Sequence, residues 1–224
     1  MGQRSQIFIN VDYKNTDYKN TNVKYLVARY FQWNYAERMV SRCRGIIEWL
    51  LAAPEFLGNA DEKKILLGRI CDVNWDFHDI VMSQDIIKEF VEDGYWDTPY
   101  EMFTGQDNND GKLYINVEVI NSNEKTKCEI KYCFADYADK YLGNATNYLN
   151  WNTADYADGP WKKSFEKKEL KYTLDNIKYI SKHAKLMTEE EYKKFIHAKY
   201  SDYDFVKARK EKKLKEKNNG PKFA

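Results

Sequence analysis

The stretch that decides the fold reads Ser5-Gln6-Ile7-Phe8-Ile9-Asn10-Val11. Isoleucine and valine occupy every second position, and alternate side chains of a strand point to the same face of a sheet. The pattern therefore predicts a β-strand with one buried face. A second alternating stretch at 23–30 is expected to pair with it, so that a hairpin covers about residues 5–30.

The two predicted strands are joined by a tandem repeat. Asp-Tyr-Lys-Asn-Thr occurs at residues 12–16 and again at 17–21. Surface loops tolerate inserted segments at small thermodynamic cost. We expect both copies to form a solvent-facing loop without a binding role.

Helices are predicted after this hairpin wherever apolar residues recur at helical spacing. These helices cover residues 36–53, 61–71 and 83–92. The first shows the clearest periodicity, and Pro54 follows it. Alternating apolar residues then return between 113 and 134 and predict a second hairpin over about residues 113–134.

C-terminal helices follow the second hairpin. One is expected within 162–183, and another begins at a capping box formed by Thr188 and Glu191. The elements together predict an α+β fold, with a mostly antiparallel sheet made from the two hairpins and covered by helices on one side. We expect residues 1–205 to form a single domain, and the lysine-rich residues 206–224 to form a flexible basic tail.

The composition of the 224 residues excludes two classes of protein. With 43% hydrophobic and 16% aromatic residues, the chain is too apolar for a disordered protein. No apolar run approaches the roughly 20 residues of a membrane-spanning helix, and no apolar secretion signal begins the chain. Four unevenly spaced cysteines fit reduced thiols. We predict a cytoplasmic protein of a host cell, without contact to a membrane.

The net charge of +1 conceals a strong segregation of charge along the chain. Residues 1–71 carry +4 and residues 72–158 carry −12, whereas residues 159–206 carry +3 and residues 207–224 carry +6. Sorted charge of this kind favours association with an oppositely charged macromolecule. Two candidate contact surfaces follow from it.

The basic candidate consists of Arg38, Arg42 and Arg44 in the predicted helix 36–53. Arg38 and Arg42 are four residues apart, so both are expected on one exposed flank. Arginine offers a planar fork that suits phosphate, and the basic tail would add further contacts to nucleic acid. The alternative is that the arginine stems pack along the helix.

The acidic candidate is a pair of Ala-Asp-Tyr-Ala-Asp motifs at 135–139 and 154–158. Spread carboxylates can imitate the phosphates of a nucleic acid, and tyrosines supply rigid contact area. The predicted contact residues are Asp136, Tyr137, Asp139, Asp155, Tyr156 and Asp158. The alternative is that the aromatic rings fill the core while the carboxylates face water.

Candidates for catalysis are few. His78, His183 and His197 show neither metal nor triad spacing. Cys128 and Cys133 would face opposite sides of a strand, which argues against a shared zinc ion. We predict no cofactor and no resident metal, and the residues favour a non-catalytic role.

One divalent-metal alternative stays open. Asp72, Asp76 and Asp79 are at helical spacing, so on a helix they would share a face and could hold Mg²⁺ through oxygen ligands. The competing interpretation is a solvated acidic face. A metal-assisted nuclease or other hydrolase would use these three residues.

Three motifs carry a resemblance to other proteins. They are Met1-Gly2-Gln3-Arg4-Ser5-Gln6-Ile7, Tyr30-Phe31-Gln32-Trp33-Asn34-Tyr35 and Gly105-Gln106-Asp107-Asn108-Asn109-Asp110-Gly111. In these motifs the chain resembles a group of small uncharacterised proteins from phages, prophages and other mobile elements of Firmicutes. The resemblance implies a gene setting in which accessory proteins often block host defence, anti-CRISPR proteins among them.

The charge pattern and this setting lead to one expected function. We expect a binding protein that inhibits a host defence system by engaging a nuclease effector, as a protein or ribonucleoprotein, or its nucleic acid. The alternatives are the metal-assisted hydrolase and a structural or assembly protein of a phage particle.

Overall fold

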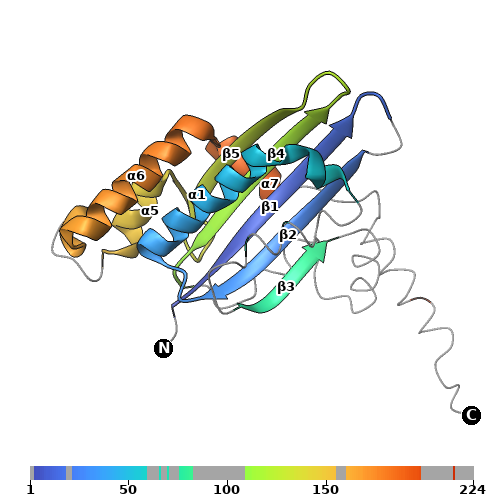
Figure 1. Cartoon of the computed structure of the whole chain (residues 1–224). Coiled ribbons are helices and arrows are strands. Elements are labelled where there is room, and N and C mark those ends of the chain that lie inside the picture. Colours follow the sequence, from blue (N-terminus) through green and yellow to red (C-terminus); the bar gives the residue numbers. More distant parts are fainter. Residues whose placement is uncertain are drawn as a thin grey trace, which may run out of the picture.

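The computed structural model describes residues 3–18, 22–59, 76–82, 109–154 and 160–197, together with Leu66, Ile70 and Leu214. A β-sheet with the strand order β3-β2-β1-β4-β5-β6 forms its centre, and β7 adds to β5 (Figure 1). The strands are β1 (Arg4–Asn15), β2 (Val23–Gln32), β3 (Asp76–Met82), β4 (Lys112–Asn121), β5 (Lys127–Ala135), β6 (Tyr141–Gly143) and β7 (Lys185–Leu186). The helices are α1 (Ala36–Ala52), α5 (Ala145–Asn152), α6 (Lys167–His183) and α7 (Glu189–Ile196), with the 3-10 helices η2 (Pro54–Gly58) and η3 (Trp161–Ser164).

The two hairpins are confirmed, but the sheet that they form is mixed. β1 pairs antiparallel with β2, and β4 pairs antiparallel with β5. The hairpins join through β1 and β4, which run parallel. The prediction of a mostly antiparallel sheet was therefore wrong. Local turn chemistry determines each hairpin. The parallel pairing of β1 with β4 depends instead on the long connection from β2 to β4, which leaves and re-enters the sheet at the same end.

The main core lies between one face of the sheet and α1. Ile7, Ile9 and Val11 of β1 are fully buried on this face, as their alternation predicts. All the predicted apolar positions of α1 are buried as well: Ala36, Met39, Val40, Cys43, Ile46, Ile47 and Leu50. Interior packing of this kind makes the helix and the strands mutually dependent.

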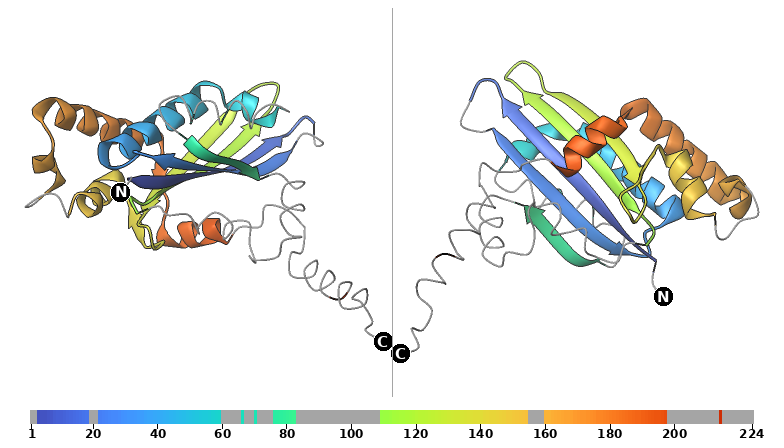
Figure 2. Two further views of the ribbon diagram at one scale, coloured as in Figure 1. Left: turned by 90° about the horizontal axis from the view of Figure 1, so that it is seen from below. Right: turned by 180° about the vertical axis from the view of Figure 1, so that it is seen from behind.

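The opposite face of the sheet is also covered in part. Figure 2 shows α1 and α6 on one side of the sheet and α7 on the other. There Tyr192 and Phe195 of α7 meet the ring of Tyr114 edge-on, with centroids 5.0 and 5.4 Å apart. The expectation that helices cover only one side was wrong, because the amphipathic α7 buries its own apolar face against the second side.

The other predicted helices and the predicted tail have different outcomes. The capping box is confirmed: the Glu191 amide donates to Thr188 Oγ1, and the Thr188 amide donates to Glu191 Oε2. Leu66 and Ile70 are helical and buried, in agreement with the prediction for 61–71. The rest of that segment, the predicted helix 83–92 and all of the predicted tail except Leu214 lie outside the described residues.

The tandem repeat behaves differently from the expectation of a loop. β1 continues to Asn15, so most of the first copy is strand. Within it Tyr13 is buried and pairs with Val23 of β2. The first copy therefore supplies a core residue, while part of the second copy, 19–21, lies outside the described residues.

Gly111, immediately before β4, lies very close to the backbone of β5 and to the ring of Trp151. Its φ is +90°, and a Cβ there would lie 2.8 Å from the carbonyl oxygen of Ala135 and 2.9 Å from a ring carbon of Trp151. We expect Gly111→Ala to lower the free energy of unfolding by about 2 kcal/mol, measured by urea denaturation. Gly45 is the control, because a Cβ there has no neighbour within 4 Å in the described part of the chain. Equal stability of Gly111→Ala and Gly45→Ala would contradict this reading.

Candidate nucleic-acid interface

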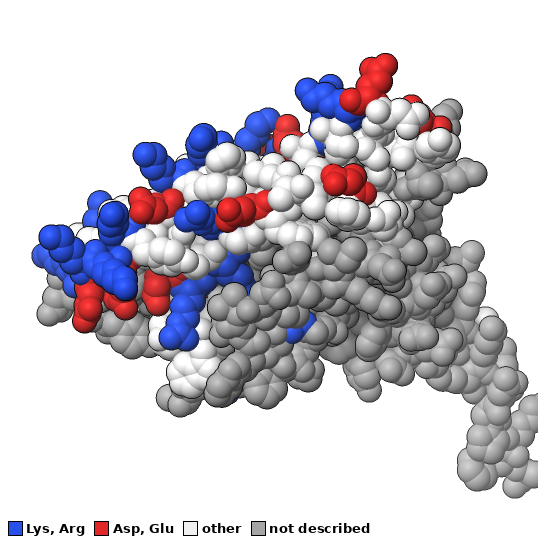
Figure 3. Space-filling view, in the orientation of Figure 1, with Lys and Arg blue, Asp and Glu red and all other residues white. Residues whose placement is uncertain are grey.

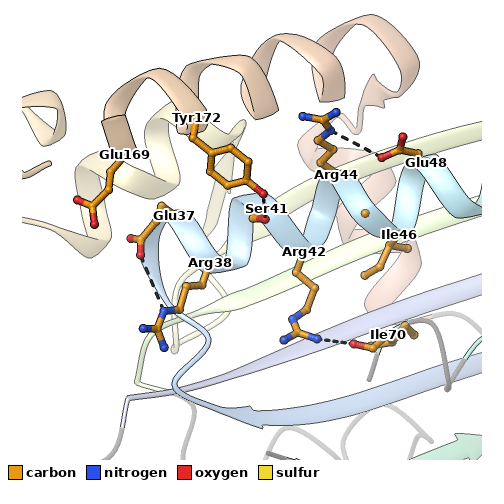
Figure 4. Close-up of a pocket in the computed structure, with 11 residues that line it drawn as sticks. Glu37, Arg38, Ser41, Arg42, Arg44, Ile46, Glu48, Ile70, Glu169 and Tyr172 are labelled. Atoms are coloured by element: carbon orange, nitrogen blue, oxygen red, sulfur yellow. Dashed lines mark hydrogen bonds and ion pairs between the residues drawn. The ribbon is translucent and has the colours of Figure 1, made fainter. Parts of the chain in front are cut away.

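The three predicted arginines all project from α1, but they lie in different environments (Figure 4). Arg38 is exposed, Arg44 is half-buried and Arg42 is only 8% exposed. The prediction that Arg38 and Arg42 share an exposed flank was therefore wrong. Spacing along a helix fixes the direction of a side chain, but it does not reveal which other segment covers that direction.

Arg42 links α1 to the turn after β2 and to Ile70. Its Nε donates to Asn34 Oδ1 at 3.2 Å, and its Nη1 donates to the carbonyl oxygen of Ile70. Its guanidinium carbon lies 4.1 Å from the centroid of the Phe31 ring, within the range of a cation–π contact. These contacts assign Arg42 a structural role, as in the packing alternative.

A pocket of about 820 Å³ opens along α1 where α6 passes it. Figure 4 shows its arginine and glutamate side chains together with Tyr172. The lining residues are Glu37, Arg38, Ser41, Arg42, Arg44, Gly45, Ile46, Glu48, Ile70, Glu169 and Tyr172. Ser41 Oγ and Tyr172 Oη are 3.0 Å apart, so a hydrogen bond links α1 to α6 across the pocket.

Arg38 and Arg44 form only long ion pairs with the acidic residues of this pocket. Arg38 Nε is 3.9 Å from Glu37, and Arg44 Nε is 3.8 Å from Glu48. Exposed pairs of this length contribute little to stability, so an incoming anion can replace them at small cost. Burial, aided by the Glu169 carboxylate, raises the pKa of Glu37.

Arg44 is fixed more firmly than Arg38. Its Nη1 donates to Asn176 Oδ1 at 3.0 Å, and its guanidinium carbon lies 4.8 Å from the centroid of the Tyr179 ring. Both partners belong to α6. Arg44 therefore ties α1 to α6 and leaves Arg38 as the most exposed of the three predicted arginines.

Exposed positive charge gathers on η3, α6 and β7. Figure 3 shows blue basic side chains along this edge of the molecule, with red acidic side chains among them. The exposed lysines are Lys162, Lys163, Lys167, Lys168, Lys171, Lys178, Lys182 and Lys185. The acidic residues from 160 to 185 are Glu166, Glu169 and Asp175.

Four of these lysines form a row, which we call the lysine stripe: Lys167, Lys171, Lys178 and Lys182. Their spacings of four, seven and four residues place them on one side of a helix. The charge of residues 159–206 taken as a whole conceals the stripe, because the acidic residues of α7 offset the lysines of α6. The helical spacing of the lysines was the signal that could have found it.

The predicted acidic surface is not assembled from the residues that the structure describes. Asp136 is 9% exposed, and its Oδ1 accepts hydrogen bonds from the amides of Ala138 and Lys140, each at 2.8 Å. Asp139 Oδ1 accepts from Lys112 Nζ at 2.7 Å. These two carboxylates organise the connection between β5 and β6, so the prediction that they form a free surface was wrong.

The remaining residues of the acidic candidate have other outcomes. Tyr137 is 60% exposed, and its ring lies 6.3 Å from that of Trp151. Asp155, Tyr156 and Asp158 lie outside the described residues. Among the three described residues of this set, Tyr137 is the most exposed.

The structure removes the basis of the Mg²⁺ alternative. Asp76 and Asp79 lie on the strand β3 and not on a helix, so the helical face on which that site depended does not exist. Asp72 lies outside the described residues. Across 3–18, 22–59, 109–154 and 160–197, no three His, Cys, Asp or Glu side chains come together as a metal site.

The described thiols are also unsuited to nucleophilic chemistry. Cys128 and Cys133 face opposite sides of the sheet, as predicted: Cys128 lies near the carbonyl oxygen of Leu50 and Cys133 near the sulfur of Met187. Burial raises the pKa of Cys128 to about 11 and that of Cys133 further. Both sulfurs therefore stay protonated at neutral pH.

The geometry thus offers a basic face on α6 and a pocket in which Arg38 remains exposed. No described helix combines the length and the apolar character that a membrane span requires. Comparisons with protein-family models, with curated proteins and with solved structures found no match to this chain.

Proposed function

We propose that this chain is a nucleic-acid-binding protein that acts without turnover. In the setting that its sequence motifs imply, it is a mobile-element accessory protein that blocks a host defence system by occupying the nucleic acid of a nuclease effector. The observation that carries the proposal is the lysine stripe of α6, the helix whose Glu169 and Tyr172 also line the pocket that contains Arg38 and Arg44.

The dimensions of the stripe suit a phosphate backbone. Lys167 and Lys182 are fifteen residues apart, which corresponds to about 22 Å along a helix. Phosphates of one strand follow each other at about 3.4 Å along the axis of a duplex, so about six of them pass this length. Each lysine is a point charge that releases a counterion from the phosphates when it binds.

Neutralising the stripe tests the proposal. In Lys167→Gln/Lys171→Gln/Lys178→Gln/Lys182→Gln, we expect the affinity for a 20-nucleotide oligonucleotide to fall at least about tenfold and the salt dependence of binding to become shallower. Fluorescence anisotropy at several salt concentrations measures both quantities. The matched control carries Gln at four exposed lysines near the strand ends: Lys14, Lys24, Lys125 and Lys127.

The control separates a defined interface from general attraction, because both variants change the net charge equally. Equal losses in the two variants would contradict the stripe as the contact surface. If the unaltered chain binds no oligonucleotide, the proposed function itself is wrong. An oligonucleotide that is cleaved during the incubation, with cleavage stopped by EDTA, would support the hydrolase alternative instead.

Capture from a host lysate extends the test to the natural partner. We expect a tagged chain to recover nucleic acid and any protein bound to it, and to lose both after nuclease treatment of the lysate. Recovery of the same protein after complete nuclease digestion would indicate a direct protein partner and would count against nucleic acid as the primary contact.

A further inference from the structure

The turn between β2 and α1 presents an exposed indole on a constrained backbone. Trp33 is 42% exposed, and its φ is +60°. Its amide donates to the carbonyl oxygen of Gln3 at 2.5 Å, and its carbonyl oxygen accepts from Arg38 Nη1 at 3.2 Å. Both contacts use backbone atoms of Trp33, so neither requires an indole.

A large side chain is an unfavourable choice at this backbone geometry. Positive φ suits glycine and asparagine, whereas bulky residues at positive φ are outliers. Backbone strain of this kind gathers at functional sites, where the surrounding structure maintains it. The combination of backbone strain and exposure at Trp33 therefore points to an indole that contacts another molecule.

The neighbouring Asn34 explains how the turn keeps this geometry. Asn34 is fully buried, and its Nδ2 donates to Ser5 Oγ at 2.9 Å. Its Oδ1 accepts from Arg42 Nε at 3.2 Å. The side chain of Asn34 thus joins β1, the turn and α1, and it holds the adjacent Trp33 in place before any ligand arrives.

A cationic group contacts the backbone of Trp33. Arg38 reaches the carbonyl of Trp33, its guanidinium carbon lies 5.5 Å from the centroid of the Tyr35 ring, and its side chain is 51% exposed. Arg38 also lines the pocket between α1 and α6. An exposed indole and an accessible guanidinium on the same turn are the kind of pair that single-stranded nucleic acids use, with a base on the ring and a phosphate on the cation.

We propose that Trp33 is a stacking platform for an unpaired nucleobase, so that the chain prefers single-stranded nucleic acid to duplex. This inference rests on the proposed function and names the class of nucleic acid. Bases inside a duplex are already stacked on their neighbours and offer no free face to a side chain, whereas single strands do. The lysine stripe contacts phosphates in either form, so the preference comes from Trp33.

The test compares a single-stranded 12-mer with a duplex of the same sequence. We expect Trp33→Leu to weaken single-strand binding about 5- to 100-fold, in line with the loss of one stacked base. Duplex binding should stay within about twofold, since electrostatic contacts are untouched. Trp33→Phe, which keeps an aromatic face, should restore most of the affinity. Phe56→Leu is the matched control, because Phe56 is 46% exposed and lies elsewhere, in η2.

Fluorescence gives an independent readout. The indole emission of the unaltered chain should be quenched by the single strand, and the quenched component should be absent from Trp33→Phe. Should Trp33→Leu fail to fold, Trp33→Gly replaces it, because glycine adopts the positive φ without strain.

The outcomes distinguish the inference from the function on which it rests. Equal affinities of the unaltered chain for single strand and duplex, together with no effect of Trp33→Leu, overturn the stacking platform and leave the proposed function standing. Failure of both nucleic acids to bind overturns the proposed function as well. If a protein ligand quenches the Trp33 emission and neither nucleic acid does, Trp33 contacts protein, and the inference is overturned as well.

Discussion

Replacing Asp139 by asparagine is expected to lower the free energy of unfolding by about 3–5 kcal/mol. Lys112 is 1% exposed, and its ammonium group lies 2.7 Å from Asp139 Oδ1. The same oxygen accepts from Tyr114 Oη at 2.9 Å. Asparagine keeps the positive φ of 63° tolerable at this position, so the variant removes the charge and leaves the backbone unstrained. A buried ammonium without its counter-charge is the source of the loss.

Chemical denaturation of a second variant isolates that cause. In Lys112→Met/Asp139→Asn neither charge is present, so we expect the double variant to lose clearly less stability than Asp139→Asn alone. Glu190→Gln, an exposed acidic change on α7, should stay within about 0.5 kcal/mol of the unaltered chain. Additive losses in the double variant would show that Lys112 does not depend on Asp139.

Tyr192 of α7 strengthens the same arrangement. Its hydroxyl donates to the Asp139 carbonyl oxygen at 3.0 Å. Burial, together with the charge of Asp139, raises the pKa of Tyr192, so this hydroxyl remains a donor throughout the neutral range. The β5–β6 connection, β4 and α7 therefore converge on a single aspartate.

The structural role of Asp136 and Asp139 limits which substitutions can test the predicted acidic surface. Reversing Asp136 and Asp139 to lysine would abolish any activity, because it would disrupt the β5–β6 connection and the pair with Lys112. Loss of binding in such a variant would thus carry no information about a contact surface. Tyr137, which is exposed and lies in the same motif, is the position at which a change of surface leaves these hydrogen bonds intact.

The parts of the fold that the sequence predicts are those that neighbouring residues determine. Helical spacing along α1 and alternation along 5–11 depend on which residues face the core, and both elements were confirmed. The prediction that β1 buries only one face was wrong, because Gln6, Phe8 and Asn10 are buried as well. The parallel pairing of β1 with β4 joins residues more than one hundred positions apart, and no local pattern encodes it. Charge averaged along the chain likewise concealed that Asp139 pairs with Lys112 across the sheet.

The candidate site also contains some features that the local sequence predicts and others that it does not. The four-, seven- and four-residue spacing of the lysine stripe is visible in the sequence once α6 is recognised as a helix. The strained turn at Trp33 has no such signature, because positive φ at a tryptophan follows from the contacts of Asn34 and not from the propensity of either residue. Which arginine is exposed also depends on a distant segment, since Ile70 covers Arg42.

Arg42 and Arg38 should therefore respond to the same substitution in opposite ways. Arg42→Met removes the donors to Asn34 and Ile70 from a buried position, and we expect it to lower the free energy of unfolding by about 2–4 kcal/mol. Arg38→Met removes an exposed guanidinium, so stability should change by less than about 1 kcal/mol.

Oligonucleotide affinity supplies the second measurement for this pair. Arg38→Met should weaken single-strand binding severalfold because a phosphate contact is lost, whereas Arg42→Met, at temperatures where it remains folded, should bind almost as well as the unaltered chain. Unfolding curves and anisotropy titrations of the same two proteins give both quantities. The opposite pattern, a stable Arg42→Met that no longer binds, would return Arg42 to the interface and would require the buried guanidinium to become accessible when nucleic acid arrives.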